Sequence, residues 1–146
     1  MEFRAEINST SLDKFVNSVN SRRHNTELSL MMEQLIDNEI FFALRQDFER
    51  TRRKGDFSPG GGTPVKSGRL QRSLTTDGRS SVGGVQRRLG RVTIKFGTTL
   101  TYAPKVERKY RFMEFTFQKV GLAALNKVKR GLPSRIRAAL RRAGVS

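Results

Sequence analysis

The clearest pattern in the chain is a strict alternation of apolar and polar residues at RVTIKF, residues 91–96. Val92, Ile94 and Phe96 fall on one face of the strand that this period of two predicts, and charged or hydroxyl residues fall on the other. A shorter alternation at residues 3–7 (FRAEI) predicts a second half-buried strand. The period of two extends over residues 74–96, where the sequence offers three turn points. They are Asp77-Gly78, Gly83-Gly84 and Leu89-Gly90.

Other stretches repeat apolar residues at the three- and four-residue spacing of an amphipathic helix. A short helix is expected at residues 12–19, and a long one over residues 26–54, ended by Gly55. At 1.5 Å per residue the long helix would measure about 43 Å. Because a small domain needs less, we expect one end to meet another subunit. A helical turn capped by Ser67 is expected to dock Leu70 and Leu74 on the sheet.

The C-terminal part is helical by the same criterion, from about Phe115 to Arg142. Gly131 is expected to end one helix and Pro133 to begin another, since proline suits a first helical turn and glycine a helix end. The residues expected inside are Phe117, Val120, Leu122, Leu125 and Val128.

These elements predict an α+β fold with one small antiparallel sheet of three or four strands. The long helix of the N-terminal half and the C-terminal helical region pack on it. The length of 146 residues fits a single domain. Its expected parts are an N-terminal strand and helices (1–54), a flexible Gly-rich loop (55–67), a β region (68–112) and C-terminal basic helices (113–146).

Composition narrows the class of protein. Only 36% of the residues are hydrophobic, so the core is expected to be modest. The chain has no cysteine, which excludes disulfides and thiolate metal sites. No apolar run reaches the ~18 residues of a membrane span, and the first residues lack a signal peptide, so we expect no membrane partner.

The net charge of +16 is concentrated in the second half of the chain. Residues 1–78 hold 12 Lys/Arg and 11 Asp/Glu, whereas residues 79–146 hold 17 Lys/Arg and two Glu. This asymmetry predicts an electrostatic partner, either an acidic protein surface, which we favour, or nucleic acid; the alternative is a solvated basic face. The expected carriers are Lys127, Lys129, Arg130, Arg135, Arg137, Arg141 and Arg142.

Few residues are candidates for catalysis or for binding a cofactor or metal. GGGTPVKSG (residues 60–68) ends like a phosphate-binding loop, but Val65 stands where that loop needs glycine and Pro64 has no N–H to offer. The only histidine, His24, lies beside two arginines. The acidic pairs Asp37/Glu39 and Asp47/Glu49 point to different helix faces and are expected to be solvated. We therefore expect no enzyme, and no catalytic, cofactor-binding or metal-binding residue.

Three motifs together resemble a family of tailed-bacteriophage tail-completion and head–tail joining proteins. TPVKSGRLQRSL (63–74) is similar to that family's T-P-V-x-[ST]-G-x-L-x-x-S, and YAPKVE (102–107) to its Y-A-x-x-V-E. RFM (111–113) resembles its R-P-F-[LM] without the proline. The loop that follows the family's glutamate is shortened here. The motif and interface candidates are Thr63, Pro64, Val65, Ser67, Gly68, Leu70, Ser73, Tyr102, Ala103, Val106, Glu107, Arg111 and Phe112.

The resemblance implies a structural virion protein without catalysis, located at the neck or upper tail and assembled in the bacterial host cytoplasm. Its expected partners are its own copies in a ring (a hexamer, or alternatively a dodecamer), adjacent neck, portal-side or tail-tube proteins, and genomic DNA as a non-specific contact. Within the fold, Glu107 is expected to pair with Arg69, Arg72 or Arg111. The alternative function is a basic nucleic-acid-binding protein.

Overall fold

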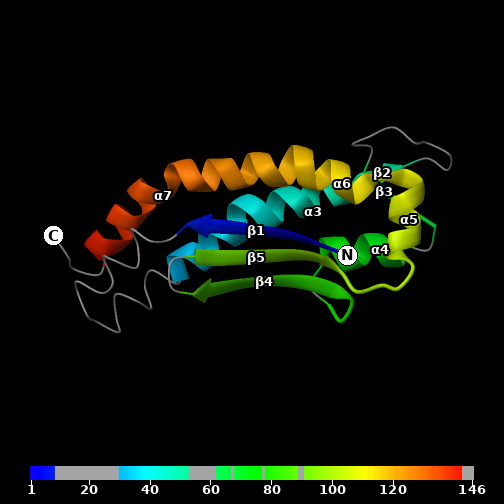
Figure 1. Cartoon of the computed structure of the whole chain (residues 1–146), viewed down its shortest axis with the longest axis horizontal. Coiled ribbons are helices and arrows are strands. Elements are labelled where there is room, and N and C mark those ends of the chain that lie inside the picture. The colour runs from blue at the N-terminus through cyan, green and yellow to red at the C-terminus, as the bar shows by residue number, and fades with distance from the viewer. Residues whose placement is uncertain (9–29, 53–61, 67, 77, 89–90, 143–146) are drawn as a thin grey trace.

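The computed structural model describes residues 1–8, 30–52, 62–66, 68–76, 78–88 and 91–142 (Figure 1). The predicted helix at residues 12–19, both ends of the predicted helix 26–54, and most of the predicted loop 55–67 lie outside these ranges.

Three antiparallel strands form the main sheet in the order β1 (Glu2–Asn8), β5 (Arg91–Thr98), β4 (Ser81–Arg88). Both predicted strands are confirmed, with alternate residues of β1 buried and Val92, Ile94 and Phe96 almost fully buried in β5. Cross-strand pairing sets the register, in which Ala5 and Val85 flank Ile94. Helices together with this sheet make the fold α+β, as predicted.

The first helical rod covers residues 30–36, continues through a π-helical turn, η1 (Asp37–Phe41), and ends with α3 (Phe42–Phe48). The prediction that this helix reaches residue 54 is wrong. After α3 the chain turns into β2 (Thr51–Arg52), which pairs in parallel with β3 (Thr63–Pro64). Helix propensity continues past Phe48, but the ladder between β2 and β3 fixes an extended backbone there.

The second helical rod consists of α6 (Phe112–Thr116), a π-helical turn η2 (Phe117–Gly121) and α7 (Leu122–Arg142). The prediction that Gly131 ends a helix is wrong, because α7 runs through both Gly131 and Pro133. Buried Val128 and Leu132 hold this stretch against the core, which offsets the hydrogen bond that proline removes. In Figure 1 the C-terminal part of α7 changes direction, as expected of a helix with internal proline.

Two short helices interrupt the region 68–112, which was predicted as β. The expected helical turn is α4 (Arg69–Thr75), with Leu70 and Leu74 buried, and α5 (Ala103–Tyr110) follows β5. Pro104 in the first turn favours helix at that point. Gly83 and Gly84 lie inside β4 and do not form a turn. Leu122, predicted inside, is 46% exposed.

The two rods run antiparallel along the molecule beside the sheet (Figure 1). A Cβ atom added to Gly121 of the second rod would lie only 3.3 Å from Leu44 of the first and 3.3 Å from Phe3 of the sheet. The rings of Phe48 and Phe96 stack at 6.1 Å, and Phe112 and Phe117 meet Phe48 edge-on. The core therefore joins both rods to the strands. None of the described helices is long and apolar enough to cross a bilayer.

Candidate functional site

The TPVKSGRLQRSL motif lies at the C-terminal end of α3. Thr63 is fully buried, and its hydroxyl donates to the Phe48 carbonyl at 2.9 Å. The Gln71 amide donates to the carbonyls of Phe48 (3.3 Å) and Glu49 (2.8 Å). Since the last carbonyls of a helix have no partner within it, these donors cap α3.

An exposed turn projects between β3 and α4. Val65 is 43% exposed, Lys66 is also exposed, and Pro64 is half-buried. Gly62 (φ +85°) and Gly68 (φ +75°) both take left-handed conformations that favour glycine. Ser67, the predicted cap, lies outside the described residues, and the α4 N-cap is Gly68. The turn thus presents a small apolar and basic tip to the surroundings.

Buried Ser73 joins α4 to the end of β5. Its hydroxyl donates to the Leu70 carbonyl (2.7 Å) and shares a hydrogen bond with the Thr98 hydroxyl (2.8 Å). The Thr98 oxygen in turn accepts from the Leu100 amide at 3.2 Å. The last serine of the motif therefore holds α4 against the sheet.

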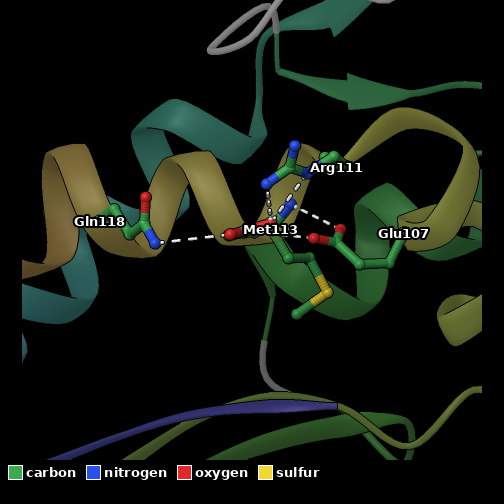
Figure 2. A network of polar contacts seen from close by, with 5 residues as sticks. Glu107, Arg111, Met113 and Gln118 are labelled. Carbon is green, nitrogen blue, oxygen red and sulfur yellow. Dashed lines mark hydrogen bonds and ion pairs between the residues drawn. The ribbon is translucent and has the colours of Figure 1, made fainter.

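The YAPKVE motif begins α5, with Tyr102 as its N-cap, Ala103 fully buried and Val106 half-buried. Figure 2 shows the Glu107 carboxylate pointing at the first turn of α6. Its two oxygens accept the amide hydrogens of Met113 (2.8 Å) and Glu114 (2.9 Å). A carboxylate at a helix N-terminus satisfies unpaired amides and suits the helix dipole, so Glu107 caps α6.

Arg111 forms the joint between α5 and α6. Its backbone is left-handed (φ 48°, ψ 35°), and its guanidinium pairs with Glu114 at 2.9 Å, on the surface. The expectation that Glu107 pairs with Arg69, Arg72 or Arg111 is replaced by this arrangement, in which both Glu107 oxygens bond backbone amides. The following Phe112 is 1% exposed and anchors the joint in the core.

The three motifs gather at one end of the molecule, where β2, β3, α4, α5 and α6 meet (Figure 1). The buried side chains of the motifs connect elements; they are Thr63, Leu70, Ser73, Leu74, Ala103, Phe112 and Met113. The exposed ones include Val65 and Lys66 at the tip, and Pro104 and Lys105, which line part of a shallow hollow of about 370 Å³. The hollow is lined by Thr101, Tyr102, Pro104, Lys105 and Arg108.

The seven predicted basic carriers all lie exposed on α7, which contains no Asp or Glu. The structure divides them by face. Lys127 forms an ion pair with Glu39 of the first rod at 3.1 Å. Arg135 and Arg142 line a cavity of about 150 Å³ against the first rod, beside Met31 and Leu35. Arg130, Arg137 and Arg141 lie on the side away from that cavity, and Lys129 on a third side.

Asp47 was predicted to be solvated, and that prediction is wrong. It is 7% exposed, its carboxylate accepts a short hydrogen bond from the Thr116 hydroxyl, and Arg50 lies 3.6 Å away. Sequence spacing along one helix could not reveal the second rod beside it. Among the described residues no group of three or more His, Cys, Asp or Glu could hold a metal ion.

No family model, curated protein or solved structure matches this chain. A function for it therefore has to be inferred from its own residues and their geometry.

Proposed function

We propose that this protein is a structural subunit of a tailed bacteriophage, acting at the neck or upper tail to complete the tail or to join it to the head. One observation supports the proposal most directly. Three motifs that resemble those of such proteins are separated by up to about 50 residues in the chain, yet adjoin at one end of the fold. Their buried residues maintain that end, and the Val65–Lys66 tip and the α5 hollow form its surface.

The subunit is proposed to act as a ring, a hexamer or alternatively a dodecamer, between adjacent neck, portal-side or tail-tube proteins in the virion. Closed rings of one chain use head-to-tail contacts, in which one surface of each copy meets a different surface of the next. An exposed tip at one end and a basic helix extending to the other supply two unlike surfaces of this kind (Figure 1). The ring would assemble in the host cytoplasm.

The decisive experiment is electron microscopy of phage particles produced without this protein. Filled heads and separate tails are the expected result, because a missing joint leaves both parts intact. Normal infectious virions would contradict the proposal.

Complementation tests the tip. Lys66→Glu reverses a charge on the exposed turn, and Lys119→Glu makes the same change on η2 as the matched control. We expect the Lys119→Glu protein to restore virions and the Lys66→Glu protein to leave heads and tails apart. Equal restoration by both proteins would show that the tip makes no contact in the particle.

A further inference from the structure

Four cations follow one side of α7, with Lys127 at its border next to the first rod. Lys127, Arg130, Arg137 and Arg141 are separated by three, seven and four residues, which places them within about 80° of one another around an α-helix. The opposite side of α7 carries the buried core residues Ala124, Val128 and Leu132. We call these four exposed residues the α7 ridge. At 1.5 Å per residue the ridge is at most about 21 Å long.

The ridge is poorly neutralised. Lys127 is bridged to Glu39, but in the described part of the chain no carboxylate lies within ion-pair distance of Arg130, Arg137 or Arg141. The helix has no acid of its own, and its C-terminal turn carries Arg141. Three guanidinium groups in a row without a carboxylate partner among the described residues, on a chain of net charge +16, produce a strong local positive potential.

The chemistry of the ridge favours phosphate over an acidic protein. Protein–protein interfaces are anchored mainly by buried aromatic or aliphatic side chains, and charged residues other than arginine are depleted from their centre. Among the side chains that the structure describes, the ridge has no such aromatic or aliphatic anchor, since exposed Leu122 lies off it at the first turn of α7. Binding to the backbone of duplex DNA requires only cationic side chains, because the backbone presents one negative charge per about 1.7 Å of helix axis. We propose that the α7 ridge binds the phosphodiester backbone of duplex DNA without reading its sequence.

This inference rests on α7 alone and does not require the neck function proposed above. If both hold, the ridge would contact the genome as it passes. Such contacts exchange readily with counterions and let DNA slide along the protein, so they do not oppose passage.

The test measures binding of the full chain to two unrelated duplexes of equal length by fluorescence anisotropy, at salt concentrations from about 50 to 300 mM. The variant combines Arg130→Gln, Arg137→Gln and Arg141→Gln, which remove three phosphate contacts and keep good helix formers. Each contact contributes about −0.9 to the slope of log affinity against log salt, so the slope should become shallower by about 2.7. At about 100 mM salt the loss of affinity should be at least ~10-fold.

The control combines Arg72→Gln, Arg79→Gln and Lys109→Gln. It removes the same charge from exposed positions on α4, on the turn before β4 and on α5, away from α7. Its slope and affinity should stay close to those of the natural chain, and both duplexes should bind equally. Circular dichroism checks that each variant is folded; should the triple variant unfold, Arg137→Gln alone should make the slope shallower by about 0.9.

Three results would overturn the inference. Equal losses of affinity in the control and ridge variants would show that only net charge matters. A natural chain that does not bind duplex at about 50 mM salt would leave the ridge without this ligand. Tighter binding of poly-L-glutamate than of duplex, at equal charge concentration, would assign the ridge to an acidic protein.

Discussion

Several polar side chains of this protein lie buried at the places where one element meets another. Thr63 bonds the end of α3, Ser73 bonds the end of β5, and Asp47 bonds Thr116 across the two rods. A buried polar group without a partner has lost its hydrogen bonds to water and gained none within the protein. Removing one partner of such a bond therefore destabilises the protein by more than the net strength of the bond. Changes of a few atoms at such residues should therefore be measurable.

Replacing Thr63 with valine should destabilise the protein by about 1–2 kcal/mol, because the Phe48 carbonyl loses its buried donor and, among the described residues, keeps Gln71 alone at 3.3 Å. Thr75→Val is the control, since the Thr75 hydroxyl bonds a carbonyl of its own helix in a partly buried place. Urea unfolding measures both. A Thr63→Val loss no greater than the control would show that the hydroxyl does not hold the end of α3.

Gly62 and Gly68 share a left-handed backbone but differ in the space around them. A Cβ on Gly62 would lie 1.9 Å from the Arg50 carbonyl oxygen, whereas a Cβ on Gly68 would meet nothing within 4 Å. Gly68→Ala should cost about 1–2 kcal/mol, the strain of the conformation alone. Gly62→Ala should cost about 3–5 kcal/mol, because the backbone of the β2–β3 pair must also move. Equal losses in chemical denaturation would contradict this crowding.

At the scale of elements, β1 and β5 were predictable, whereas the helix ends and the short strands β2 and β3 were not. The alternation at residues 91–96 is a local signal, and β5 follows it. The end of α3 at Phe48 depends on donors from Thr63 and Gln71, which no local propensity reveals. The persistence of α7 through Pro133 depends likewise on Leu132 packing into the core.

The candidate site likewise has features that the sequence predicts and features that it does not. The motif residues could be identified from the sequence. Their hydrogen bonds to other elements could not, because the bonding partners lie far along the chain. Ser73, for example, is bonded to Thr98, 25 residues away. The Glu107 carboxylate bonds the first amides of α6, a contact set by the left-handed turn at Arg111, whereas a charge count suggests an arginine partner. The basic residues of α7 could be named from the sequence, but only the helix geometry separates the ridge from Arg135 and Arg142.

Two glycines in the second rod give a matched pair of predictions. A Cβ added at Gly131 has no neighbour within 4 Å, so Gly131→Ala should stabilise the protein by about 1 kcal/mol through the higher helix propensity of alanine. Gly121→Ala gains the same propensity but would press on Leu44 and Phe3, each 3.3 Å from the new Cβ. Overpacking of this kind costs about 1–3 kcal/mol, so the variant should be less stable than the natural chain. Thermal unfolding ranks the two, and a Gly121→Ala protein as stable as Gly131→Ala would disprove close contact between the rods.

At the scale of the whole molecule, charge repulsion opposes folding. A net charge of +16 on 146 residues repels itself in the compact state, and salt screens that repulsion. Raising NaCl from about 20 to 300 mM should therefore increase the melting temperature, by roughly 2–6 °C if screening contributes about 1–1.5 kcal/mol. The variant lacking Arg130, Arg137 and Arg141 should show a smaller rise because its charge is lower. A melting temperature that falls with salt would mean that ion pairs outweigh repulsion.

The pairing of β1 with β5 also determines when the protein can fold as it is made. The nearest bonded pair, Asn8 and Arg91, closes a loop of most of the chain. During synthesis at about 5–20 residues per second, β1 leaves the ribosome about 4–17 s before its partner strand begins to appear. For that interval Phe3, Ala5 and Ile7 have no sheet to enter, although they form a buried edge of the finished core. Segment β1 thus carries unburied apolar residues while the chain is being made, and the subunit can join an assembly only after β5 has been made.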